Sequence, residues 1–97
     1  MAPSGPTLAA SDRVRRVPDL MAATVDGELV MMDVQRGVYF GLDAIGSSIW
    51  ARLEVPASAE ELAAEFARDY DADIATIEAD VLALFRRLLD RGLVEIM

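Results

Sequence analysis

The chain has no cysteine, no histidine and no lysine, and these absences exclude most kinds of active site. Without cysteine there is neither a disulfide nor a thiolate nucleophile. Without histidine there is no usual zinc site and no histidine acid–base chemistry. All nine cations are arginine, which also excludes Schiff-base lysines and the phosphate-binding lysine of a P-loop. We therefore expect a binding protein that needs no cofactor, and not an enzyme.

Long apolar runs are missing as well. No run approaches the roughly 20 residues that span a bilayer. Residues 1–6 lack the charged-then-apolar order of a secretory signal peptide. The expected location is therefore the cytoplasm.

The length of 97 residues, with 54% hydrophobic residues, predicts one domain with a small core. Such a core leaves little room for an internal site. Residues 1–11 are rich in Pro, Gly, Ser and Ala without periodicity, which predicts a mobile N-terminal tail. The folded domain is then expected over residues 12–97.

Negative charge dominates, with a net value of −8. Between residues 57 and 80 there is one cation, Arg68, and there are eight acids. These acids are Glu60, Glu61, Glu65, Asp69, Asp71, Asp73, Glu78 and Asp80. Such a field repels nucleic-acid backbones. A solvated face is the main interpretation, and a surface that attracts a basic partner is the alternative.

Some of these acids match the spacing of a calcium loop, but the match fails at one position. The sharp turn of such a loop requires glycine where this chain has Ile74. No metal site is predicted. Ser47 and Ser48 have no histidine or lysine base, so no catalytic nucleophile is predicted either.

The first half of the chain predicts three antiparallel strands. Residues 20–25 and 28–34 flank Asp26-Gly27, a pair typical of a type I′ hairpin turn. Gly37 fits the left-handed position of a second hairpin loop, which leads into a third strand at 38–42. Residues 13–17 could form a short extended segment but are too short to assign, and residues 93–97 could add a short final strand.

The second half has helical periodicity. Asp43 can cap a first helix, Ser58 and Glu61 form a capping box for a second, and Asp73 can cap a third that ends at Gly92. Three strands followed by three helices predict an α+β, winged-helix-like fold.

Two features suggest a binding surface. The third strand has no proline and no charge to block edge pairing. The third helix has an apolar arc wider than one core face needs, so it is either clamped between two layers or meets a partner. Val81, Leu84 and Leu88 share one stripe, while Leu82, Phe85 and Leu89 continue the apolar surface around the side.

The stretch from Asp33 to Asp43 (DVQRGVYFGLD), with Gly46 and Ile49-Trp50, resembles the signature of the PqqD family. The C-terminal run Asp80-Val81, Leu84-Phe85, Leu88 and Gly92-Leu93-Val94 is similar to the second landmark of that family. One departure is Asp43, where the family usually has Asn. Both residues cap helices, so the fold is unaffected, although an amide donor is lost.

The resemblance implies a domain that captures the leader segment of a ribosomally made, modified peptide. The leader adds a strand along the third strand, and its side chains enter the groove between that strand and the third helix. The implied peptide-binding residues are Val38, Tyr39, Phe40, Gly41, Leu42, Leu82, Phe85, Arg86 and Leu89. We expect Phe85 and Leu89 to be partly exposed, while the opposite assignment of the two helix stripes stays open.

Within the family the chain looks most similar to the stand-alone partner of lasso-peptide maturation, which implies a leader peptidase and a cyclase as partner enzymes. The alternative is the protein of pyrroloquinoline quinone biosynthesis that works beside a radical SAM enzyme. Two other classes stay open: a winged-helix DNA-binding regulator, disfavoured by the acids of the second helix, and a scaffold subunit without leader specificity.

Overall fold

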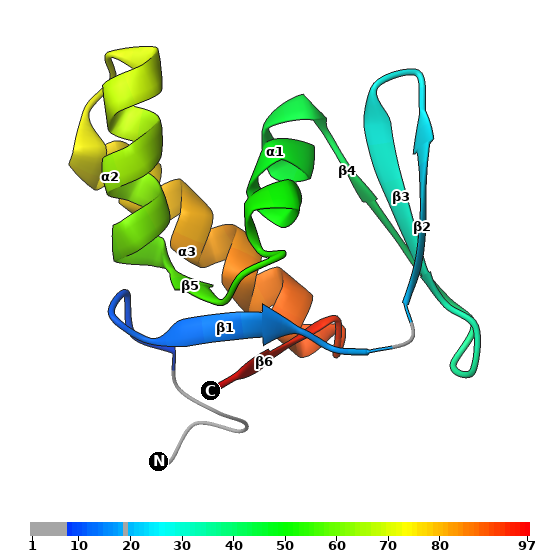
Figure 1. Ribbon diagram of the computed structural model, residues 1–97. Helices are drawn as coiled ribbons and strands as arrows, with labels where there is room; N and C mark the ends of the chain where they lie inside the picture. The colour runs from blue at the N-terminus through cyan, green and yellow to red at the C-terminus, as the bar shows by residue number, and fades with distance from the viewer. Residues whose placement is uncertain (1–7, 19) are drawn as a thin grey trace.

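A computed structural model describes residues 8–18 and 20–97. In this part of the chain, helices and strands form an α+β arrangement, as the sequence predicts (Figure 1). In chain order the elements are β1 Arg13–Arg16, β2 Met21–Val25, β3 Glu28–Asp33, β4 Val38–Leu42, α1 Ala44–Arg52, β5 Ala57–Ser58, α2 Ala59–Tyr70, α3 Ile74–Asp90 and β6 Val94–Ile96.

The strands β2, β3 and β4 form the predicted antiparallel meander. Its first turn has positive φ at Asp26 and Gly27, 53° and 81°, which are the angles of a type I′ turn. Gly37 has φ 68° in the second loop, as predicted, and this loop spans residues 34–37 because β3 ends at Asp33. The residues at these two turns therefore determine how the three strands of the meander follow one another.

A second sheet consists of β5, β1 and β6 in that order. The sequence indicated β6 as a possible final strand but did not predict the pairing of the three strands. The central strand β1 pairs antiparallel with both neighbours, and Val14 lies opposite both Ala57 and Ile96. The sheet brings the two ends of the described chain together beneath the helices (Figure 1). Winged-helix-like is therefore only a loose description of this fold.

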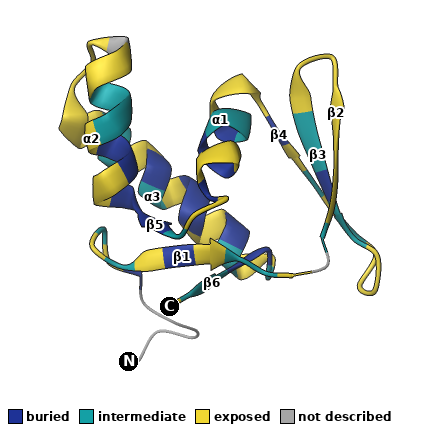
Figure 2. Cartoon of the chain, in the orientation of Figure 1, coloured by how far each residue is buried: buried dark blue, intermediate teal, exposed yellow. Residues whose placement is uncertain are grey.

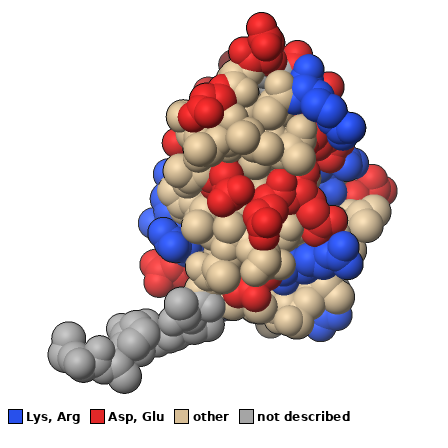
Figure 3. Space-filling view, turned by 90° about the vertical axis from the view of Figure 1, so that its left-hand side faces the viewer, with Lys and Arg blue, Asp and Glu red and all other residues tan. Residues whose placement is uncertain are grey.

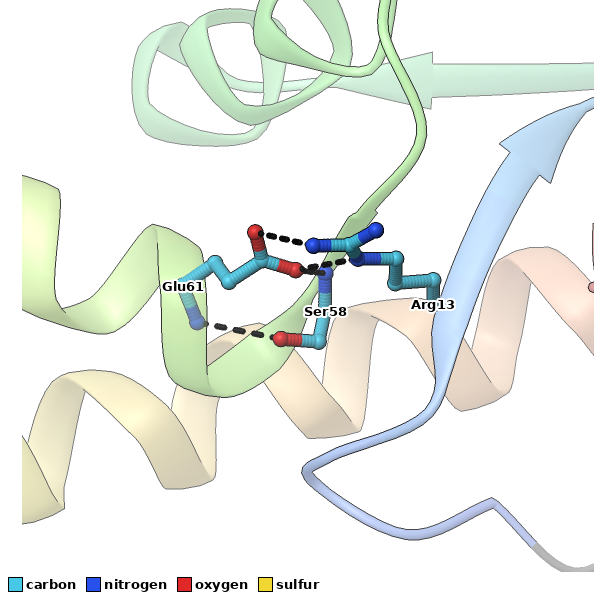
Figure 4. Close-up of polar contacts among 3 residues, drawn as sticks. All are labelled: Arg13, Ser58 and Glu61. Carbon is cyan, nitrogen blue, oxygen red and sulfur yellow. Dashed lines mark hydrogen bonds and ion pairs between the residues drawn. The ribbon is translucent and has the colours of Figure 1, made fainter.

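Each helix begins at the predicted cap. The side chains of Asp43 and Asp73 accept hydrogen bonds from main-chain N–H groups of the first turns of α1 and α3. At α2, the Ser58 hydroxyl accepts from the Glu61 N–H, and the Glu61 carboxylate accepts from the Ser58 N–H. These reciprocal bonds form the predicted capping box (Figure 4).

Glu61 also joins α2 to the second sheet. Its carboxylate lies 2.8 Å from Arg13 Nε on β1 (Figure 4). The Arg13 guanidinium, together with the Ser58 N–H, lowers the pKa of Glu61 below its usual value. The ion pair is exposed, so its contribution to stability is small.

Helix α3 is clamped between two layers, one of the two alternatives that its wide apolar arc allowed. Val81, Leu84, Phe85 and Leu88 are all buried, and they pack with residues of both sheets and the other two helices in one core. Figure 2 shows this buried band along α3, while the far end of the meander is exposed. The apolar width of α3 is therefore largely explained by the core.

The folded part begins earlier than residue 12. Leu8 is buried in the core, and the Ala10 carbonyl accepts a hydrogen bond from the Glu60 N–H. Residues 8–11 therefore belong to the domain, and the remainder of the predicted tail, residues 1–7, lies outside the described residues. No helix in the described ranges has the length and apolar character to cross a bilayer.

Candidate functional site

The outer edge of β4 carries main-chain groups that no other strand pairs. Among the described residues, β4 pairs with β3 alone. At the end of that ladder, the Ser47 hydroxyl accepts from the Leu29 N–H and donates to the Leu42 carbonyl, so these two groups face each other. Polar groups alternate in direction along an antiparallel strand. The N–H and C=O groups of Tyr39 and Gly41 therefore face outward.

The side chains of β4 divide between two faces. Leu42 is buried, and Val38 and Phe40 are half-buried on the face that meets the helices. Tyr39 points to the opposite face, where its side chain is 64% exposed. The strand thus has an edge of outward-facing main-chain groups, and one of its two faces packs against the rest of the domain.

A cleft of about 540 Å³ lies alongside this edge, between β4, α1 and α3. Its wall on α3 consists of residues at helical spacing, namely Asp80, Ala83, Leu84 and Arg87. The rest of the lining comes from the end of β4 and the start of α1, namely Gly41, Leu42, Asp43, Ile45, Gly46 and Ile49. An extended peptide on β4 would lie with one row of its side chains toward this cleft.

Gly46 keeps this end of the cleft compact. A Cβ atom at this position would lie 3.1 Å from Leu42 Cδ2 and 3.2 Å from Asp43 Oδ1, closer than ordinary van der Waals contact. A glycine here lets α1 begin directly against the end of β4.

Only some of the predicted site residues line the cleft. Gly41 and Leu42 line the cleft, and Val38, Tyr39 and Phe40 lie on the same edge strand. On α3, Leu82 and Leu89 are half-buried against the core, and Arg86 is exposed, but none of these three lines the cleft.

The expected exposure of Phe85 is wrong. Its side chain has 0% relative exposure and is the largest of the fully buried side chains among the described residues. Leu84 and Phe85 lie about 100° apart on the helix, and α3 is clamped on both sides, so both are buried. Leu84, which was assigned to the core, also lines the cleft.

The cleft wall on α3 was missed because it contains only one large apolar residue. The four residues of this wall occupy positions i, i+3, i+4 and i+7 counted from Asp80, so they share one face of α3. The signal that could have marked this face is Ala83, a small residue where a large one would fill the cleft.

Positively charged side chains lie close together at the end of the cleft nearest the β3–β4 loop. The guanidinium groups of Arg87 and Arg91 each lie 5.8 Å from the centre of the Phe40 ring. Arg36 donates a hydrogen bond of 3.1 Å to the Arg91 carbonyl, at the C-terminal end of α3. Cations are favoured at this end of a helix and over an aromatic face.

Acidic side chains cover a different face of the molecule. Glu60, Glu61 and Asp69 of α2 are exposed, and Figure 3 shows acids distributed over the side that α2 forms. Asp71 ends α2 with φ 48°, and Asp73 caps α3. Within residues 8–18 and 20–97, no three acidic side chains form a group that could hold a metal ion.

Comparison with known proteins gives a family match and a similar solved structure. No curated protein matches the sequence. A solved structure described as TbiB1 in complex with the TbiA(beta) leader peptide is similar, with a TM-score of 0.74 and 36% identity. The match covers 84% of this chain and 94% of TbiB1. The family model described as coenzyme PQQ synthesis protein D (PqqD) matches residues 28–94. The resemblance identified in the sequence is thereby confirmed, and the chain belongs to the PqqD family.

Proposed function

We propose that this chain binds the leader segment of a ribosomally synthesised precursor peptide, which adds as a fourth strand along β4. The observation that carries the proposal is the outward-facing main chain of Tyr39 and Gly41 directly beside the cleft. Main-chain hydrogen bonds to a sheet edge supply affinity that is largely independent of sequence. The leader peptide in the TbiB1 complex supports the proposal.

The side chains that select the leader are those that border the added strand. In this proposal Val38, Phe40 and Leu42 form one side of the groove, and the α3 wall forms the other, with Ala83 and Leu84 at its centre. Pockets for alternate side chains of an added strand provide sequence choice. The proposal retains the five strand positions predicted from the sequence and replaces those on the helix.

The bound leader is then delivered to maturation enzymes in the cytoplasm, and the protein itself performs no chemistry. The resemblance favours a leader peptidase and a cyclase of lasso-peptide maturation. The alternative is pyrroloquinoline quinone biosynthesis, after which the family is described. There the resemblance implies a radical SAM enzyme as the partner. Which of these enzymes is encoded beside this chain distinguishes the two pathways.

A DNA-binding regulator is the less favourable hypothesis. A recognition helix needs cations that approach the phosphates, whereas α2 exposes Glu60, Glu61 and Asp69. A gel shift at low salt tests this alternative directly. A retarded duplex would count against the peptide-binding proposal.

Amide exchange measured by NMR tests strand addition residue by residue. The probe is the TbiA(beta) leader peptide, and a scrambled peptide of the same composition is the control. We expect the leader to slow exchange at the Tyr39 and Gly41 amides, because these become hydrogen-bonded. The Phe40 amide, already paired with β3, changes little. Equal effects of leader and scramble, or protection on α2 instead of β4, would contradict the proposal.

A further inference from the structure

Arg36, Arg87 and Arg91 lie together at the C-terminal end of α3, and no carboxylate neutralises them fully. Arg36 lies 3.9 Å from Asp33, which is a long ion pair. Arg87 and Arg91 are exposed and make no ion pair with a described residue. In a chain with net charge −8, three cations at one end of a groove form a local reversal of charge.

The fold holds this cluster in place. Gly92, with φ 74°, ends α3, and a Cβ atom there would collide with the guanidinium of Arg36. The glycine therefore allows Arg36 to lie against the end of α3, where it binds the Arg91 carbonyl. Arg87 and Arg91 lie one helical turn apart, so both reach the same ring of Phe40.

We propose that Arg36, Arg87 and Arg91 form a carboxylate subsite that recognises an acidic side chain of the bound peptide. The proposal rests on the peptide-binding function above and deepens it, because it names one charge that the leader must carry. A guanidinium pair offers several N–H donors to one carboxylate, and such charge-assisted bonds are stronger than neutral ones. Arg87 also lines the cleft, so the subsite is continuous with it.

The position of the acid in the peptide follows from the strand register. Peptide residues that face the groove lie opposite Leu42, Phe40 and Val38 and are spaced by two. A large apolar residue opposite Leu42 enters the cleft, and the acid lies opposite Phe40 or Val38. An antiparallel peptide passes Leu42 first, so its acid is two or four residues C-terminal to the apolar residue.

A selection from a displayed library of random twelve-residue peptides tests the subsite without a known precursor. The baits are the unchanged protein, the double variant Arg87→Gln/Arg91→Gln, and Arg68→Gln. Arg68 is a matched control because it is an exposed arginine in the last turn of a helix, α2, and does not line the cleft. Circular dichroism establishes that all three proteins are folded equally.

We expect the unchanged protein and Arg68→Gln to enrich peptides with an acid at the second or fourth position after a large apolar residue. The double variant should lose this preference for an acid. Replacing the acid of an enriched peptide by its amide should weaken binding to the unchanged protein by roughly tenfold. The same replacement should change binding to the double variant by less than about twofold.

Two other outcomes separate the hypotheses. Enriched peptides that bind equally with acid or amide would overturn the carboxylate subsite and leave leader binding intact. A library from which no peptide is enriched over an albumin control would overturn peptide binding itself, and the subsite with it.

Discussion

Proline substitutions at two adjacent positions of β4 distinguish its outer edge from its inner edge. The Tyr39 N–H faces outward, so Tyr39→Pro removes no hydrogen bond of the sheet. The Phe40 N–H faces β3, so Phe40→Pro removes one ladder bond. Proline favours an extended conformation in the residue before it, and β4 already has that conformation.

Tyr39→Pro is expected to weaken peptide binding more than it lowers stability, whereas Phe40→Pro is expected to lower stability strongly. Tyr39 is 64% exposed, so Tyr39→Pro should lower the free energy of unfolding by less than about 1 kcal/mol. Its loss of a donor should weaken peptide binding by about 1–3 kcal/mol, which corresponds to roughly 5- to 150-fold in Kd. Phe40→Pro should cost about 1–3 kcal/mol of stability beyond the cost of Phe40→Ala, because one ladder hydrogen bond is lost, which lowers Tm by at least about 4 °C in a domain of this size.

Thermal melts followed by circular dichroism measure stability, and fluorescence polarisation with a labelled leader peptide measures affinity. Tyr39→Ala and Phe40→Ala are the controls, because they remove the side chains and keep the N–H groups. If Tyr39→Pro melts as low as Phe40→Pro, the assignment of the outer edge is wrong. If it stays folded and binds as tightly as Tyr39→Ala, strand addition at β4 is refuted.

Three further predictions concern the core, acid stability and salt. Phe85→Ala should lower the free energy of unfolding by about 3–5 kcal/mol in urea titrations, because the ring is fully buried, and a cost below about 1 kcal/mol would contradict that burial. Glu61, whose pKa Arg13 lowers, favours the folded state above about pH 4.3, and this contribution is lost as the pH falls through its depressed folded pKa. Glu61→Gln should therefore give a shallower dependence of Tm on pH in acid than the unchanged protein, and identical curves would exclude this role. Peptide affinity should fall by less than about tenfold between roughly 50 and 200 mM salt, whereas six to ten phosphate contacts would cost about 10³–10⁵.

The meander and the helix caps could be predicted because their signals are local. Asp26-Gly27 specifies a type I′ turn whatever lies elsewhere in the chain, and the φ angles there confirm it. Asp43, Ser58 and Asp73 each bond to N–H groups within three residues. Such bonds depend on a few neighbouring residues, so they can be predicted from the sequence alone.

The second sheet could not be predicted because its pairing is distant and its strands are short. Arg15 lies opposite Glu95, eighty residues away, and their side chains form an ion pair of 2.7 Å. The strand β5 has two residues, Ala57 and Ser58, and shows no alternation that a pattern could detect. Tertiary packing, not local preference, decides these strands.

The assignment of α3 failed for a different physical reason. Periodicity locates an apolar arc on a helix, but it does not say which part of a wide arc is buried by the rest of the chain. Val81, Leu84, Phe85 and Leu88 have the same apolar character, and all four are buried once the second sheet is present. The cleft then falls on the flank of the arc, at Ala83 and Arg87, where the sequence is not strongly apolar.

The overlap of core and cleft at α3 follows from the size of the chain. A domain of 97 residues has one core, and the helix that completes this core is also the helix that flanks the edge strand. Leu84 belongs to both, because it is 5% exposed and still lines the cleft. We expect its truncation to perturb both folding and the proposed peptide binding, so a variant of Leu84 cannot separate the two. Tyr39 and Arg87 are exposed and lie outside the core. Recognition in this fold can therefore vary at the rim of the groove without changing the side chains that stabilise the domain.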